Sequence, residues 1–165
     1  MRERRASQGV RRTREFETFV AGAAGRLLHT ATLLTAESGD ANPRARRLLT
    51  MALGHTYASW DRLHGEDPYD STRRQLIARF QRTVWHQYGS LGRRRTSPDH
   101  VLAGLTPQER LILVVRLYEG VAEEQAAALL GLPAERVRAI CARAMATLLH
   151  PPRGPAPARV EVAPS

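Results

Sequence analysis

Lysine is absent from this chain of 165 residues, and cysteine, aromatic residues and long apolar runs are scarce. The single cysteine, Cys141, excludes a disulfide bond within the chain, which suits a reducing cytoplasm. No apolar run is long enough to cross a membrane, and the N-terminal segment lacks the apolar core of a signal peptide. These absences predict a cytoplasmic protein with no membrane segment.

Patterns of catalytic and metal-binding residues are also absent from the sequence. The six histidines do not pair at metal-ligand spacings with one another or with Cys141. The chain has no phosphate-binding glycine loop and no nucleophile elbow. Glu66, Asp67 and Asp70 cluster at a predicted helix start, where acids stabilise the helix dipole and can cap. We therefore expect no enzyme activity, cofactor, metal or small-molecule substrate.

All 25 basic residues are arginine, and the net charge of +9 favours a polyanionic partner. Arginine without lysine, together with abundant Ala, Gly and Pro, is typical of a GC-rich genome such as that of an actinobacterium, so each arginine need not signal specific recognition. The excess charge is unevenly distributed, because residues 1–14 contribute +5 and residues 102–149 contribute zero. The first segment is therefore interpreted as a flexible basic arm.

Residues 106–149 have the pattern of a helix-turn-helix. Thr106 and Glu109 predict a capping box at the start of a mostly apolar and therefore buried helix. A short second helix ends at Gly131, which supplies the positive φ of a tight turn. Pro133 opens a third helix, in which apolar residues recur at helical spacing. Such a third helix lies in the major groove of DNA in helix-turn-helix proteins.

The other face of the third predicted helix combines arginines with small residues. Small residues allow close approach to a groove, while arginines reach phosphates and base edges. A solvated helix surface explains the same pattern, although the turn glycine and the three-helix spacing favour DNA binding. The residues of this face are Arg136, Arg138, Ala139, Ala142 and Arg143.

Three further helical patterns precede the helix-turn-helix, and no segment alternates with period two, so we predict an all-α fold. Residues 88–100 are polar, with two glycines, a proline and an arginine triplet, which is typical of a flexible linker between two small helical domains. The predicted organisation is a basic disordered arm at 1–14, a three-helix domain at 15–87, a linker at 88–101, a helix-turn-helix domain at 102–149 and a Pro-rich disordered tail at 150–165.

The layout resembles that of the extracytoplasmic-function sigma factors of bacterial RNA polymerase, in a divergent actinobacterial form. Their region four is similar to the segment LAGLTPQERLILVVRLYEGVAEEQAAALLGL, and their region two to FETFVAGAAGRLLHTATLLT, ALGHTYASWDRL and DPYDSTRRQLIARFQRTVW. The resemblance implies a transcription initiation factor whose region two binds the polymerase clamp and melts the minus-ten element. Region four would read the minus-thirty-five element. An anti-sigma protein is a further candidate partner.

The resemblance implies three groups of contact residues. Minus-thirty-five contacts fall on Arg136, Arg138, Ala139 and Arg143. Minus-ten contacts fall on Arg73, Arg74, Ala78, Arg82 and Trp85. Contacts to core RNA polymerase fall on Arg46, Arg47, Thr50 and Met51. Trp85 has two interpretations, stacking on unpaired bases or packing in the core, and its place after Val84 favours the core.

The sequence departs from the family pattern in the polymerase-binding segment, where Arg46 and Arg47 replace the usual acids. A reversed charge at a close ion pair costs specificity. Two hypotheses therefore stand: a sigma-like factor that directs core polymerase to promoters, or a sigma-like adaptor that has lost productive core binding and acts by binding a protein partner or DNA.

Smaller departures affect the DNA-reading helices. Pro133 replaces a capping serine, and Ala78 lies near the place of the family's promoter-opening asparagine. Glu135 at the start of the last helix would repel phosphate, accept a hydrogen bond from cytosine, or stabilise the helix dipole.

Overall fold

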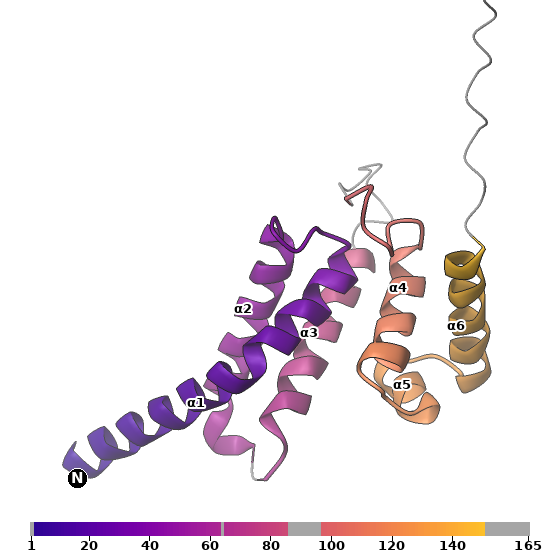
Figure 1. The fold of residues 1–165 in the computed structure, drawn as a ribbon. Helices are drawn as coiled ribbons and strands as arrows, with labels where there is room; N and C mark the ends of the chain where they lie inside the picture. Colours follow the sequence, from indigo (N-terminus) through magenta and orange to yellow (C-terminus); the bar gives the residue numbers. More distant parts are fainter. Residues whose placement is uncertain (1, 64, 86–96, 151–165) are drawn as a thin grey trace, which may run out of the picture.

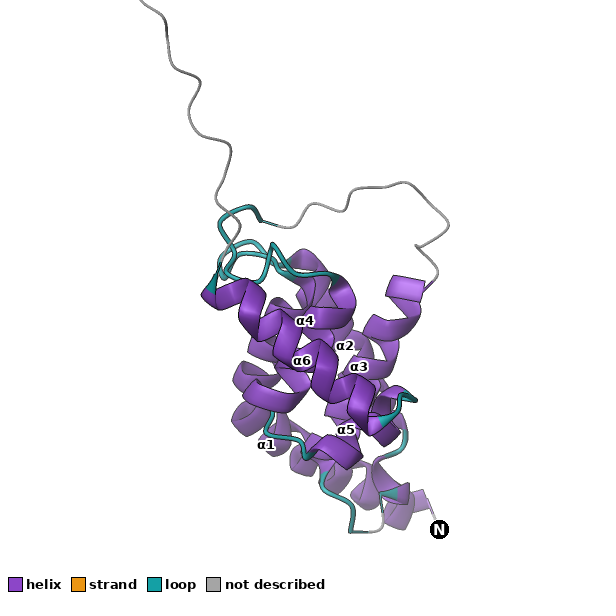
Figure 2. Ribbon diagram, turned by 90° about the vertical axis from the view of Figure 1, so that its right-hand side faces the viewer, coloured by secondary structure: helices purple, strands orange, loops and turns teal. Residues whose placement is uncertain are grey.

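The computed structural model describes residues 2–63, 65–85 and 97–150. Its elements are α1 (Arg2–Thr35), α2 (Pro43–Ala58), the 3-10 turn η1 (Trp60–Arg62), α3 (Pro68–Trp85), α4 (Pro107–Leu113), the π-helical η2 (Val114–Tyr118), α5 (Glu123–Leu130) and α6 (Ala134–Leu149). Within these residues there are helices, turns and loops but no strand (Figure 2), which confirms the all-α prediction. No described helix is long and apolar enough to span a membrane.

Helices α1, α2 and α3 pack together as the first half of the molecule (Figure 1). Their apolar stripes meet in a core that includes Leu27 of α1, Ala52 of α2 and Ile77 of α3. A polar pair also joins α2 to α3 inside this core, because the hydroxyls of Thr56 and Thr72 lie 2.9 Å apart and both are buried. Each hydroxyl also bonds to the backbone carbonyl four residues back in its own helix, so the pair adds a polar link between two hydroxyls that are already satisfied.

The start of α2 is held by an acid from the preceding loop. Asn42 is the N-cap residue but makes no side-chain capping bond. Instead the carboxylate of Glu37 accepts hydrogen bonds from the backbone N–H groups of Arg44 at 3.1 Å and Ala45 at 2.8 Å. Burial raises the pKa of Glu37, but these bonds and that of the Arg44 side chain outweigh it, so the pKa is lowered. This carboxylate therefore sets the position of the helix that carries the candidate polymerase contacts.

The second half has the helix-turn-helix local structure that the sequence predicts. Thr106 and Glu109 form the capping box of α4, and Gly131, with φ of 66°, ends α5 in the left-handed region. The first helix of the motif differs from expectation, because its last turn widens into the π-helical η2 before Gly120, at φ 68°. The backbone N–H of Glu119 consequently bonds to the carbonyl of Val114, five residues back.

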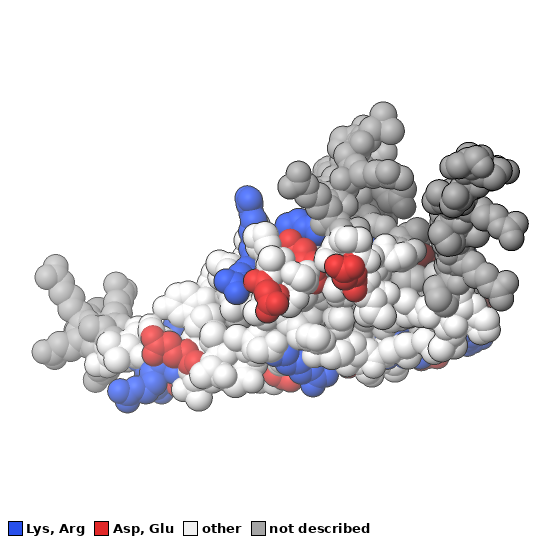
Figure 3. All heavy atoms as spheres, turned by 45° about the horizontal axis from the view of Figure 1, so that its top comes forward, with Lys and Arg blue, Asp and Glu red and all other residues white. Residues whose placement is uncertain are grey.

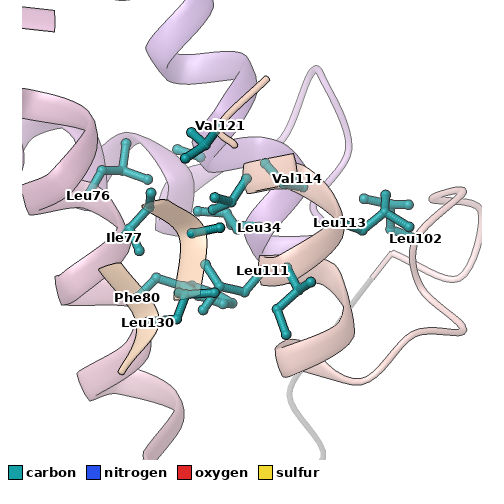
Figure 4. Close-up of a cluster of buried hydrophobic side chains, with 14 of the residues drawn as sticks. Leu34, Leu76, Ile77, Phe80, Leu102, Leu111, Leu113, Val114, Val121 and Leu130 are labelled. Atoms are coloured by element: carbon teal, nitrogen blue, oxygen red, sulfur yellow. The ribbon is translucent and has the colours of Figure 1, made fainter. Parts of the chain in front are cut away.

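The two halves share one hydrophobic core. Figure 4 shows buried side chains of both halves in a single cluster, with Phe80 of α3 next to Leu130 at the end of α5. The guanidinium of Arg110 in α4 is buried and donates to the carbonyl of Leu34 in α1 at 3.2 Å. Burial lowers the pKa of Arg110 to about 10. Helix α4 therefore lies against the first half, while α6 lies on the outer side of the second half (Figure 1).

The segment predicted to be a disordered arm is helical instead, since α1 begins at Arg2. Arg12 ties this part of the helix to the body: its guanidinium lies 4.3 Å from the ring centre of Tyr57 and donates to Asp61 at 3.1 Å. These partners lie in α2 and η1, far along the chain, so the sequence of residues 1–14 alone does not reveal them. Residues 88–96 of the predicted linker, residues 86–87 before it and residues 151–165 of the predicted tail lie outside the described residues.

Candidate nucleic-acid interface

Helix α6 buries one face and exposes the opposite one. Val137, Ile140 and Ala144 are buried against the second half. At 100° per residue, the face opposite them carries Glu135 and Ala139, both exposed, with further alanines. After Glu135 in the first turn, the centre of the outer face of α6 carries small side chains, which permits close approach to a nucleic-acid groove.

The three arginines of α6 lie along the two edges of this alanine face. Arg136 and Arg143 are seven residues apart and share the edge nearer α4, whereas Arg138 lies on the edge nearer α5. All three are exposed. The structure thus brings together Arg136, Ala139 and Arg143 on one side of the helix and places Arg138 apart from them.

An acid from α4 holds Arg143. The Nε atom of Arg143 donates to Oε1 of Glu109 at 2.8 Å, and the Arg143 side chain remains 64% exposed. Burial raises the pKa of Glu109, but hydrogen bonds from the Thr106 backbone and from Arg143 outweigh it and lower the pKa. Glu109 therefore stays ionised beside the candidate DNA contact.

An acid from α5 holds Arg138 in a different way. Both Nε and Nη2 of Arg138 donate to the carboxylate of Glu123, at 3.3 and 2.6 Å. Among the described residues no partner is found for Arg136. The three arginines thus differ in how much of each guanidinium is already engaged.

The candidate minus-ten residues on α3 are not equally accessible. Arg82 is exposed, Ala78 is half-buried, and Arg74 is exposed and pairs with Glu66. Arg73 lies at the junction of the two halves, where its side chain is only 16% exposed and pairs with Asp70 and Glu119. The backbone of Trp85 ends α3, and its side chain lies outside the described residues.

The pairing of Arg73 belongs to a polar cluster around Glu119, which the sequence did not reveal. The side chain of Glu119 is fully buried and accepts hydrogen bonds from the hydroxyls of Thr30 and Tyr69, the latter at 3.0 and 3.1 Å. Arg26 lies 3.6 Å away. Burial, and then the charge of Glu119, raise the pKa of Tyr69 to about 12. This cluster joins η2 to α1 and α3.

The candidate polymerase contacts share one exposed side of α2. Arg46, Arg47 and Thr50 are exposed, and Met51 is 46% exposed. Arg46 is steadied by its Nε donating to the side chain of Asn42 at 2.9 Å. The structure therefore brings these four residues together as a basic surface with an apolar residue at one end.

Charge is mixed on the face that Figure 3 draws. In Figure 3, arginines and acidic side chains lie intermixed over a mostly uncharged face. No group of three potential metal ligands occurs among the described residues. Cys141 is half-buried, and burial raises the pKa of its thiol, which fits a packing residue rather than a nucleophile.

Comparisons with known proteins place this geometry in a family. Residues 101–150, which include the whole helix-turn-helix, match the family model described as Sigma-70, region 4. The RNA polymerase sigma-E factor of Streptomyces coelicolor is 30% identical over 153 residues, covering 81% of this chain and 84% of the relative. The chain belongs to the sigma factors of bacterial RNA polymerase. It falls in their extracytoplasmic-function group, as the resemblance implied.

A second relative and one solved structure are also similar to this chain. The sigma-E factor of Streptomyces avermitilis is 29% identical over 153 residues, covering 81% of this chain and 83% of the relative. The fold is similar to that of the sigma factor RpoE of Bartonella quintana, solved in complex with the anti-sigma factor NepR. The TM-score is 0.60 at 18% identity, over 81% of this chain and 94% of that one. Sigma factors are non-catalytic transcription factors, so the family fits the expectation that the chain is not an enzyme.

Proposed function

We propose that this sigma factor binds core RNA polymerase in the cytoplasm and directs it to specific promoters. Its helix-turn-helix half would read the upstream promoter element. One observation carries the proposal. The segment that matches region four forms a helix-turn-helix, and the last helix of that motif exposes arginines beside a row of alanines. A helix with this surface suits a major groove, because the small alanine side chains allow the helix to approach the bases closely while the arginines reach phosphates and bases.

We assign region two to residues 15–87, a linker to 88–101 and region four to 102–149. In this assignment α6 enters the groove with Ala139 facing the bases and with Arg136 and Arg143 on one edge. Arg138 makes a weaker contribution, because Glu123 already holds two of its three guanidinium nitrogens.

For region two we assign minus-ten contacts to the surface of α3 that carries Arg74, Ala78 and Arg82, with Trp85 at its end. Arg73 reaches promoter DNA only when Glu119 releases it, since that carboxylate now lies 3.5 Å from its Nη1 atom. Full engagement of the minus-ten element therefore requires the two halves to separate at the Glu119 cluster.

We assign polymerase binding to the α2 surface of Arg46, Arg47, Thr50 and Met51. Its exposure supports the assignment. Its positive charge requires an acidic counterpart on the polymerase, and Met51 requires an apolar one. An anti-sigma protein is a further expected partner, because the structurally similar Bartonella sigma factor is held in such a complex.

The test combines the purified chain with core polymerase from an actinobacterium and a pool of genomic promoter fragments. We expect a complex with core that survives gel filtration at moderate salt, and transcripts that depend on the added factor. Arg136→Ala should weaken transcription from the selected promoters, whereas Arg62→Ala, at an exposed site away from the assigned surfaces, should not. If no complex with core forms, the adaptor hypothesis replaces the initiation factor.

A further inference from the structure

Glu109 connects the first helix of the helix-turn-helix to the edge of the DNA-reading helix. Its Oε2 atom accepts hydrogen bonds from the backbone N–H and the hydroxyl of Thr106, both at 2.9 Å. Its Oε1 atom accepts from Nε of Arg143 at 2.8 Å. We propose that Glu109 is a positioning residue that orients Arg143 to read a guanine in the upstream promoter element. This inference rests on the proposed function.

The arrangement leaves the two terminal nitrogens of the Arg143 guanidinium available to contact a base. Only its Nε is bonded to Glu109, and neither Nη1 nor Nη2 donates to a described residue. A guanidinium presents these two nitrogens as a planar fork that matches the O6 and N7 atoms of guanine. Fixing the side chain at Nε removes much of its rotational freedom before DNA binds, which lowers the entropic cost of contact.

Glu109 is well placed to act as a rigid support. Its side chain is 10% exposed, and the capping box binds it to the start of α4. The hydrogen bonds that lower its pKa also keep it ionised, so it remains an acceptor for Arg143. A support of this kind transmits its effect through Arg143 alone and needs no contact with DNA.

The pairing of Arg138 differs from that of Arg143. Glu123 accepts from both Nε and Nη2 of Arg138, which takes up one side of the guanidinium fork. Bidentate contact to a base through the two terminal nitrogens would therefore share Nη2 with that ion pair. Among the three α6 arginines, Arg143 alone combines a fixed Nε with two unengaged terminal nitrogens.

Two simpler roles for Glu109 are to cap α4 and, as an anion, to repel DNA phosphates. Each of these roles predicts a different effect from that of a positioning residue. A pure cap affects the stability of the domain, and a repulsive anion weakens binding to all DNA sequences alike. A positioning residue affects the preference for particular bases, and only those that Arg143 reads.

The experiment uses the complete chain bound to core polymerase and a pool of templates randomised across the upstream element. Sequencing of the transcribed templates gives a base preference at each position. With Arg143→Ala we expect the preference for guanine at one or two positions to fall about tenfold. Glu109→Gln keeps an acceptor for the Thr106 N–H but removes the charge that holds Arg143, and we expect it to lose preference at the same positions.

The double variant Glu109→Gln/Arg143→Ala should resemble Arg143→Ala alone, because Glu109 acts through that arginine. Thr106→Ala is the matched control: it weakens the capping box but leaves the Glu109–Arg143 contact, so the melting temperature should fall while base preferences persist. The inference is overturned if Glu109→Gln keeps the wild-type preferences, alters every position equally, or adds to the effect of Arg143→Ala. A wild-type pool with no enriched element would instead refute the proposed function itself.

Discussion

Replacing Glu119 by alanine is the most severe test of how the two halves are joined. The carboxylate is fully buried and is shared by Thr30, Tyr69 and Arg73. Its removal leaves two hydroxyls without this acceptor and leaves Arg73, 16% exposed, with Asp70 as its remaining ion-pair partner. Breaking a buried pair by removing one partner costs about 3–5 kcal/mol. We expect a value near the lower limit, about 3 kcal/mol, because Asp70 still neutralises Arg73 in part.

For a chain of this length, a loss of about 3 kcal/mol lowers the melting temperature by about 6–12 °C. Thermal unfolding followed by circular dichroism at 222 nm measures the change. Glu66→Ala is the matched control, because it removes an exposed ion pair with Arg74 and should cost less than about 1 kcal/mol. If Glu119→Ala is no more destabilising than Glu66→Ala, the buried cluster does not hold the halves together.

Three further predictions concern stability. Because the pKa of Tyr69 rises from 10 unfolded to about 12 folded, its contribution to stability should be fully present below pH 10 and be lost as the pH rises toward 12, and Tyr69→Phe should remove this step in alkaline unfolding curves. The pKa of Glu37 is lowered below 4.5, so its contribution should be present above pH 4.5 and lost as the pH falls through the folded value; acid unfolding of Glu37→Gln should show a smaller loss than wild type. Gly131→Ala, at a φ of 66°, should cost about 1 kcal/mol in urea unfolding, whereas Gly104→Ala, outside the left-handed region, should cost less.

The parts of the fold that depend on local sequence could be predicted. The capping box of Thr106 and Glu109 and the turn at Gly131 need only residues within a few positions of each other, and both are present. The apolar stripes of the first three helices likewise appear as the core of α1, α2 and α3. Periodicity reports which face of a helix is buried, so the all-α class followed from it.

The features that depend on distant partners could not be predicted. Glu119 comes directly after an apolar helix, and none of its neighbours in the sequence indicates that it is buried. Its partner Tyr69 lies fifty residues away in the sequence. The same holds for Arg12, whose contact with Tyr57 ties the start of α1 to α2. Sequence also gave no means of telling which α6 arginine would be engaged, because Glu109 and Glu123 approach the helix from other elements.

Association with core RNA polymerase is the most direct test that this chain acts as a transcription initiation factor. The α2 surface carries Arg46 and Arg47 at positions where the resemblance to the family leads us to expect acids, so binding to core is the step in which this chain departs most from that expectation. The measurement is the dissociation constant of the complete chain for core polymerase, together with promoter-dependent transcript yield. We expect a stable complex that produces transcripts from selected promoters. A chain that fails to bind core, yet still folds with its helix-turn-helix intact, would contradict this expectation.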